Sequence, residues 1–361
     1  MRWNVNLSAI STTLRNLVCA VFSLGSLAGL SHADDRAAKL EILRRWTAEA
    51  AAIKTAKIKC LHAKLSPAAG TELARVPPED GIEDSLTSEE FRVLFQEHLV
   101  PLAGRPKARE ALERAVETCI AEAGRKLDAL WSELEIVQDG ENVRNDEVYS
   151  KTRNVRLVTP ERFYSYESSL NAAMIGGRNS MFAHARTTRD LKFAPDSAPP
   201  DGVDQVQLIP SVADQEAKLV APGAEIVFDS TTGFVKYLVA SDAEAGGIFY
   251  ENRQALPCEW TGDVVMPTIS ATVRYRKTRA GESRISNVDL FVIETAEFNQ
   301  KIAPADLRVA VPKGTVIGAT DILPELSEAK KPAGTVTAAE DIADLASVKS
   351  MAEIKAVRRQ K

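Results

Sequence analysis

From about residue 143 onward, the chain consists of short runs rich in Val, Ile, Phe and Tyr, separated by Gly, Pro, Asp, Asn or Ser. Polar and apolar residues alternate in these runs, which is typical of strands with one solvent-exposed face. No alternation of strands with helices is visible, so a doubly wound parallel sheet is not indicated. The pattern predicts a long antiparallel meander with strands at 154–159, 162–167, 180–185, 225–228, 234–240 and 247–251.

The best-defined hairpin lies near the end of this region. Residues 264–277 and 284–298 are predicted to pair through a turn at Arg279-Ala280-Gly281-Glu282. Between Ala271 and Arg276, apolar residues alternate with Thr or Arg, as expected for a sheet with one wet face. The hairpin therefore gives the sheet its longest predicted strands.

The chain before residue 143 has a mainly helical pattern. A first helix is predicted over 34–56 and a strand over 57–65. Thr87-Ser88-Glu89-Glu90 fits a capping box for a helix reaching about Val100, and a longer helix is predicted from Pro106 to Leu134. The predicted fold class is α+β, as one domain over 34–323 with helices in 34–135 packed on a sheet in 143–323. The first helix carries an apolar stripe of Ala37, Leu40, Leu43, Trp46, Ala50 and Ile53.

Residues 1–33 have the features of a secretory signal. Arg2 and Arg15 give a positive start without acids, 17–30 is a short apolar core, and Ser31-His32-Ala33 supplies small residues before a cut at Asp34. An uncleaved anchor is the alternative, but the apolar core is shorter than the roughly 20 residues of a spanning helix. We therefore expect a periplasmic or extracellular protein that does not span the membrane after cleavage.

The charge of the chain limits the classes of partner that it can bind, and its cysteine count limits the number of disulfide bonds. The chain has 45 basic and 50 acidic residues, and the first 33 residues contain arginines but no acid, so the mature chain is acidic and a nucleic-acid partner is not indicated. Cys60, Cys119 and Cys258 remain after cleavage and permit at most one internal bridge. A Cys60–Cys119 disulfide is the preferred pairing, and three free buried thiols are the alternative.

No local motif indicates catalysis or metal binding. The chain lacks GxSxG, HExxH, Walker and GxGxxG patterns, and it has no CxxC. His62, His98 and His184 show no ligand spacing and are interpreted as structural, although Arg186 and Arg189 near His184 are compatible with a base or an anion site. We expect no enzymatic activity, no cofactor and no metal.

The C-terminal residues differ from the rest. Residues 324–339 have linker composition, and 340–361 are predicted to form a last helix or tail with a basic end. A solvated, frayed helix is the favoured interpretation. The alternative is a docking segment for an envelope partner or an anionic surface.

The order of elements in this exported chain resembles the lipoprotein-carrier (LolA/LppX-like) superfamily of envelope proteins. The run from Asp306 to Val316 (DLRVAVPKGTV) is similar to the closing strand and Gly-Thr turn of large proteins of that type. The resemblance implies a curved, half-barrel-like sheet whose apolar cavity is closed by helices. It implies ligand-cavity positions at Leu40, Leu43, Trp46 and Ile53, which would equally line a dry core without a ligand.

Three functional hypotheses follow from these patterns. The first is an exported, non-catalytic binding or carrier protein for a lipid or acyl chain, with a cavity between the first helix and the sheet. The second is an envelope or surface module that binds a protein or polysaccharide through an exposed patch. The third, and least favoured, is a hydrolase without recognisable motifs, which would need a carboxylate pair or His184 with a nucleophile in one cleft.

Overall fold

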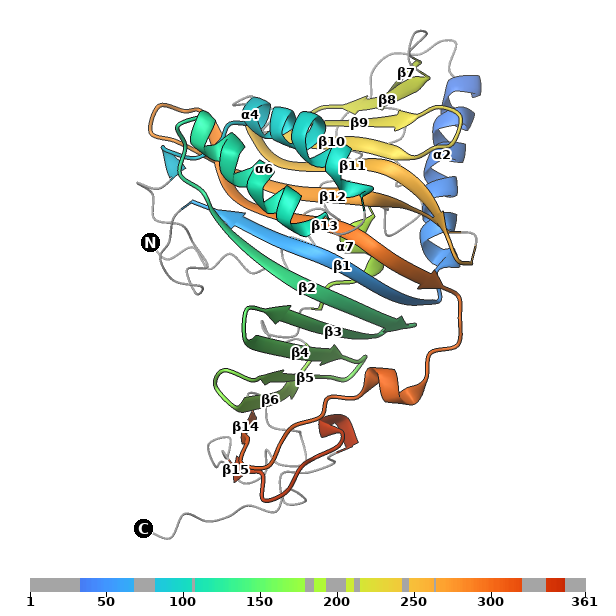
Figure 1. Cartoon of the computed structure of the whole chain (residues 1–361). Helices are drawn as coiled ribbons and strands as arrows, with labels where there is room; N and C mark the ends of the chain where they lie inside the picture. Colours follow the sequence, from blue (N-terminus) through green and yellow to red (C-terminus); the bar gives the residue numbers. More distant parts are fainter. Residues whose placement is uncertain are drawn as a thin grey trace.

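One large sheet organises the computed structural model, which describes residues 33–67, 82–105, 108–178, 185–192, 206–210, 215–241, 247–262, 264–319 and 336–347. Within these residues, the sheet is curved and unclosed (Figure 1). Its strands, in spatial order, are β15 (Val336–Thr337), β14 (Val316–Ala319), β6 (Ala172–Gly177), β5 (Arg162–Glu167), β4 (Thr152–Val158), β3 (Asn142–Tyr149), β2 (Asp128–Asp139), β1 (Thr55–Ser66), β13 (Ser283–Phe298), β12 (Val264–Lys277), β11 (Ile248–Trp260), β10 (Val235–Ser241), β9 (Ala224–Asp229), β8 (Glu216–Ala221) and β7 (Gln207–Pro210). The predicted α+β class with a long, curved antiparallel sheet is confirmed.

The central strands are the longest and fix the register of the sheet. Strand β1 pairs with both β2 and β13, so that Ile58 lies opposite Ile136 on one side and Ala296 on the other. Strands β12 and β13 form the predicted hairpin, in which Lys277 lies opposite Ser283. These pairs are antiparallel, whereas β14 runs parallel to β6 at the far side of the sheet.

Alternation along β1 separates two faces of the sheet. Leu61 and Leu65 point into an apolar cluster that includes side chains of four helical segments, and we call this side the helix face. Ile58 and Cys60 point the other way, into a separate cluster with residues around α7 (Thr188–Leu191), and we call this side the second face. The helical segments of the helix face are α4 (Ser88–Val93), the π-helix η1 (Leu94–Leu99), α5 (Val100–Ala103) and α6 (Arg109–Glu122).

The helix face is mainly an apolar core, which also encloses the buried ion pair of Glu251 and Arg253 on β11. Phe91, Leu94, Leu112 and Val116 are fully buried against strand side chains such as Leu290. Burial of a Leu or Phe side chain contributes roughly 1.5–3 kcal/mol to stability. This layer therefore holds α4 to α6 firmly on β1, β12 and β13.

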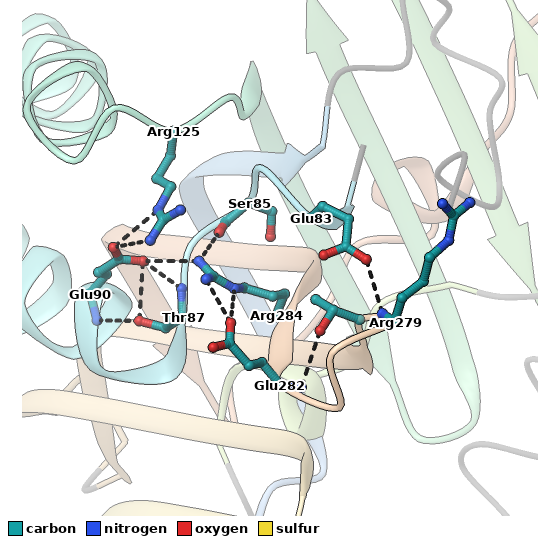
Figure 2. A network of polar contacts seen from close by, with 9 residues as sticks. Glu83, Ser85, Thr87, Glu90, Arg125, Arg279, Glu282 and Arg284 are labelled. Carbon is teal, nitrogen blue, oxygen red and sulfur yellow. Dashed lines mark hydrogen bonds and ion pairs between the residues drawn. The ribbon is translucent and has the colours of Figure 1, made fainter. Parts of the chain in front are cut away.

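Hydrogen bonds and ion pairs between charged side chains close the rim of this core (Figure 2). The Arg125 guanidinium donates two hydrogen bonds to Glu90 Oε1 at 3.0 and 2.8 Å, and Arg284 on β13 donates to the Ser85 carbonyl at 3.0 Å. Burial raises the pKa of Glu90, but hydrogen bonds from Arg125 and Thr87 lower it more, so the net shift is downward. These rim contacts thus connect the start of α4 both to the residues after α6 and to the β12–β13 hairpin.

The second face carries two other helices. Helix α2 (Ala33–Ala52) places Leu43 and Trp46 in an apolar cluster with β8, β9 and β10, and Leu191 of α7 is buried beside β12 and β13. In Figure 1, α2 stands along the outer strands, away from α4 and α6. The predicted first helix and first strand are therefore confirmed, with a boundary between Ala52 and Thr55.

The helix predicted from Pro106 to Leu134 is wrong in its second half. Helix α6 ends at Glu122, and Gly124 adopts a φ of 61°, a left-handed conformation that glycine adopts readily and that commonly terminates helices. Residues 128–139 then form β2, in which Ser132, Leu134 and Ile136 are buried on the second face. In this segment, the alternation of buried and exposed side chains along the chain determines the structure, although the residue composition favours a helix.

The C-terminal residues join the sheet instead of starting a helix at 340. Within the described part of this region, β15 covers 336–337, Ile342 bridges to Val311, and Leu345 is fully buried at a short 3-10 helix, η4 (Leu345–Ser347). Another 3-10 helix, η3 (Pro304–Leu307), precedes this region. The rest of the predicted linker and basic tail, the signal segment 1–32, His184 and most of the predicted strand 180–185 lie outside the described residues.

The capping box of α4 gives a direct test of this architecture. Thr87 Oγ1 accepts from Glu90 N at 3.2 Å while Thr87 N donates to Glu90 Oε2 at 2.7 Å, as the sequence predicted. Thr87→Ala should lower the free energy of unfolding by about 1 kcal/mol, because a backbone N–H loses its acceptor. Urea denaturation measures this, and Thr87→Ser, which keeps the hydroxyl, should stay near wild type. Equal losses in both variants would contradict a capping role.

Candidate functional site

The candidate site lies on the second face, where α2 packs against the outer strands. Leu43 and Trp46 are 5% and 3% exposed, and the Trp46 ring meets Phe228 edge to face with centroids 5.4 Å apart. We call this contact region the α2 seam. Its buried members are Leu43, Trp46, Val206, Ala217, Leu219, Phe228, Val235, Leu238, Ala240 and Tyr250, and its partly buried members are Leu40, Ile42, Leu208, Ala221 and Ile226.

Polar contacts fix the middle of α2 at the edge of this seam. Trp46 Nε1 donates to the Gly233 carbonyl at 2.7 Å, and the Arg45 guanidinium donates to the Thr232 carbonyl in the same turn. One turn further along α2, Glu49 accepts from Lys192 Nζ at 2.9 Å. Helix α2 is therefore attached both to the β9–β10 turn and to the residue that follows α7.

The four positions predicted for a ligand cavity do not all lie together. Leu40, Leu43 and Trp46 belong to the α2 seam, with Leu40 half-buried at its margin. Ile53 lies beyond the end of α2 and packs against the other cluster of the second face, which contains Ile58. Three of the four side chains thus share one surface.

The preferred Cys60–Cys119 disulfide is absent, and Cys60, Cys119 and Cys258 are free thiols. Cys60 is buried on the second face, where its Sγ lies 3.6 Å from the Leu134 carbonyl, whereas Cys119 packs on the helix face. The sheet separates the two sulfurs. Burial raises the pKa of the Cys60 thiol well above its usual value, so this thiol stays protonated and unreactive.

A buried charged network crosses the middle of the second face. His62 on β1 lies between two carboxylates, with Nδ1 2.7 Å from Glu147 Oε1 and Nε2 3.3 Å from Asp289 Oδ1. The Arg186 guanidinium donates to Asp289 Oδ1 at 2.7 Å, and Ser132 Oγ donates to Glu147 Oε1 at 2.7 Å. We call His62, Ser132, Glu147, Arg186 and Asp289 the polar network.

Phe291 and the backbone support this network. The His62 ring stacks on Phe291 with centroids 4.8 Å apart, and the Arg186 guanidinium lies 4.9 Å from the same Phe291 centroid, a distance that allows cation–π attraction. Asn145 Nδ2 donates to the Arg186 carbonyl at 2.9 Å. The segment before α7 is thereby held on β3 and β13, which in turn places Lys192 against α2.

The electrostatics of the network favour the ionised carboxylates. Burial raises the pKa of Glu147, but the hydrogen bond and charge of His62 and the hydrogen bond of Ser132 lower it to a net value of about 2. Burial also opposes ionisation of Asp289, yet the Arg186 charge holds its pKa well below the usual range. Burial lowers the pKa of Arg186, but the Asp289 charge raises it more. Glu147, Asp289 and Arg186 are therefore charged together at neutral pH.

This arrangement is better suited to holding structure than to proton transfer. Ser132 Oγ lies 3.2 Å from His62 Nδ1, which resembles a nucleophile and base, but the same hydroxyl donates to Glu147. Ser132 and His62 are 2% and 3% exposed. Among the residues that the structure describes, no three His, Cys, Asp or Glu side chains are grouped so as to hold a metal ion.

His62 is structural in the sequence-based interpretation, and no sequence pattern predicts the polar network. Its members come from β1, β2, β3, β13 and the residues before α7, so no local spacing connects them. One signal was present, because Asp289 interrupts the apolar run from Val288 to Ile293. A single acid in such a run indicates a buried ion pair.

Comparison with known proteins gives only a loose architectural likeness. No protein-family model matches the chain, and no curated protein matches its sequence. A solved DUF1329 family protein from Desulfovibrio piger aligns with a TM-score of 0.37 and 7% identity, over 75% of this chain and 96% of that one. A domain from Vibrio parahaemolyticus, described as an outer membrane lipoprotein-sorting protein, aligns with a TM-score of 0.35 and 8% identity, over 75% and 97%. We transfer no residue role from either protein.

No helix among the described residues combines the length and the apolar content needed to cross a bilayer.

The depressed pKa of Glu147 predicts how stability changes with pH. Because the pKa is about 2 in the folded protein and 4.5 in an unperturbed carboxyl, ionised Glu147 stabilises the fold above about pH 4.5. This contribution is lost as the pH falls from 4.5 towards 2. Glu147→Gln should therefore be less stable than wild type at pH 7, with a difference that shrinks in acid.

Chemical denaturation at pH 7, 5, 4 and 3 measures this difference. Glu259→Gln, which changes an exposed carboxylate on β11, is the matched control and should leave the pH profile near that of wild type. A stability gap for Glu147→Gln that stays constant from pH 7 to 3 would contradict the assigned role.

Proposed function

We propose that this protein is an exported, non-catalytic binding or carrier protein for an apolar ligand, a lipid or acyl chain, held in the α2 seam. The observation that carries the proposal is the separation of this seam from the main apolar core, which lies on the helix face. Helix α2 covers outer strands of the sheet, and its apolar surface continues into partly buried residues at the margin, including Leu40 and Ile42. Acyl chains bind to apolar surfaces of this kind between a helix and a sheet.

The way α2 is attached supports the same proposal. Its hydrogen bonds at Arg45, Trp46 and Glu49 go to the β9–β10 turn and to Lys192, not to the strands beneath its apolar side. These three contacts therefore lie at the edge of the apolar surface between α2 and the strands and do not cross it. Export, predicted from residues 1–33, would place such a protein in the cell envelope, where acyl chains must be kept from water.

The experiment is native mass spectrometry of the full chain purified from an exporting host, followed by organic extraction and lipid analysis. We expect a co-purified lipid in near-stoichiometric amount. Leu40→Asp places a charge at the margin of the seam and should reduce lipid occupancy at least several-fold, because a carboxylate is poorly solvated against an acyl chain.

Ala38→Asp is the matched control, since Ala38 lies on the exposed side of the same helix. It should retain lipid, and thermal unfolding should show that both variants are folded. A ligand-free mass for the wild type, with no extractable lipid, would contradict the carrier proposal and favour an envelope module that binds a protein or polysaccharide.

A further inference from the structure

Several buried polar atoms of the second face have no hydrogen-bond partner among the described residues, including Trp260 Nε1 and Arg274 Nε. Two of these atoms are neighbours: Oε1 of Gln254 on β11 and Oγ of Ser270 on β12. The two residues lie directly opposite each other in the β11–β12 register and are 3% and 2% exposed. Leaving such atoms unpaired is unfavourable, so a pair of them at one place points to a partner that is supplied from elsewhere.

Neighbouring side chains fix the orientation of Gln254. Its Nε2 donates to Asn252 Oδ1 at 3.0 Å, and Asn252 Nδ2 in turn donates to Thr272 Oγ1 at 3.2 Å. The amide nitrogen of Gln254 is therefore engaged, and its carbonyl oxygen is left as an acceptor. Ser270 Oγ beside it can both donate and accept.

This pair borders the α2 seam. Asn252, next to Gln254 on the same face, lies opposite Leu238 of the seam, and Tyr250 of β11 is itself a seam member. On the other side, Ser270 lies opposite Phe291, whose ring stacks on His62 of the polar network. The second face thus changes from apolar to polar at Gln254 and Ser270.

The charges nearby are already paired with one another. Asp289 contacts Arg186, His62 and, at 3.8 Å, Arg274, while Glu147 contacts His62. Gln254 and Ser270 are themselves neutral, and Arg186 and Arg274 already contact Asp289, so an additional buried charge at the pair would be poorly compensated. A neutral group with one donor and one acceptor is the best match.

We propose that Gln254 and Ser270 bind the uncharged, hydroxyl-bearing head group of an amphiphile whose acyl chain lies in the α2 seam. The ligand hydroxyl donates to Gln254 Oε1 and accepts from Ser270 Oγ. This inference rests on the proposed function, because it assigns the head group of the same ligand.

The test compares three ligands with the same chain by titration of delipidated full-length protein in native mass spectrometry. Monooleoylglycerol carries hydroxyls, methyl oleate has no donor, and oleate is charged. Wild type should bind monooleoylglycerol about ten-fold more tightly than methyl oleate, as expected for a buried hydrogen-bonded pair. Gln254→Leu and Ser270→Ala should each remove most of this preference and leave methyl oleate binding unchanged.

Ser286→Ala is the matched control. Ser286 is also a buried serine, but its Oγ donates to the Arg274 carbonyl at 3.1 Å, so this variant should lose stability and keep the ligand preference. Ser270→Ala should unfold at or above the wild-type temperature without ligand, because it removes an unpaired hydroxyl. Gln254→Leu also removes the hydrogen bond from Nε2 to Asn252 Oδ1, so its unfolding temperature should fall without ligand. A clear loss of stability in Ser270→Ala would mean that Oγ has a protein partner, and would overturn the inference.

The outcomes separate the two proposals. If none of the three ligands binds to wild type, the carrier function and the head-group site both fail. If all three bind equally and the variants match wild type, the carrier function stands and the head-group site is overturned. If oleate binds most tightly, the head group is an anion and the inference is again wrong.

Discussion

The structure depends on a strand that is paired on both edges and buried on both faces. Strand β1 is hydrogen-bonded to β2 and β13, and its side chains enter one apolar cluster through Leu61 and Leu65 and another through Ile58 and Cys60. From Cys60 to Ala63 every residue of this strand is buried. A charged or polar residue there must find its partners within the protein, which is why His62 lies between two carboxylates.

This constraint gives the two faces different characters. On the helix face the strands meet helices mainly through apolar side chains, with Glu90 and Arg284 at the rim. Glu251 and Arg253 of β11 form a buried ion pair on the same face. On the second face the polar network occupies the middle of the sheet and holds the segment before α7. Through Lys192 this segment also fixes Glu49 of α2. The position of α2 is therefore linked to charges buried at β1 and β13.

The sequence predicted local features better than contacts between distant segments. The β12–β13 hairpin and the α4 capping box were predicted correctly, because turn chemistry and periodicity lie within a few residues. Helix α6 was predicted too long, since the strand pattern of β2 begins only after Gly124. The polar network was not predicted, because His62 and Asp289 are brought together by a strand pairing across more than two hundred residues. The Cys60–Cys119 pairing failed for the same reason, as the face on which each residue lies follows from that pairing.

The distribution of polar residues on the second face argues against a sheet selected for stability alone. Buried ion pairs contribute little net stability, and each unpaired buried polar atom costs about 1–3 kcal/mol. On the helix face of the same strands, Ala271 and Val273 of β12 are apolar, and the residues opposite them on β11, Arg253 and Glu251, are paired with each other. Replacing Gln254 and Ser270 by apolar residues would merge the seam under α2 with the cluster around Phe291 into one dry core. Gln254 and Ser270 instead keep a polar boundary at the inner end of the seam, and under the proposed carrier function this boundary fixes how far an acyl chain can enter.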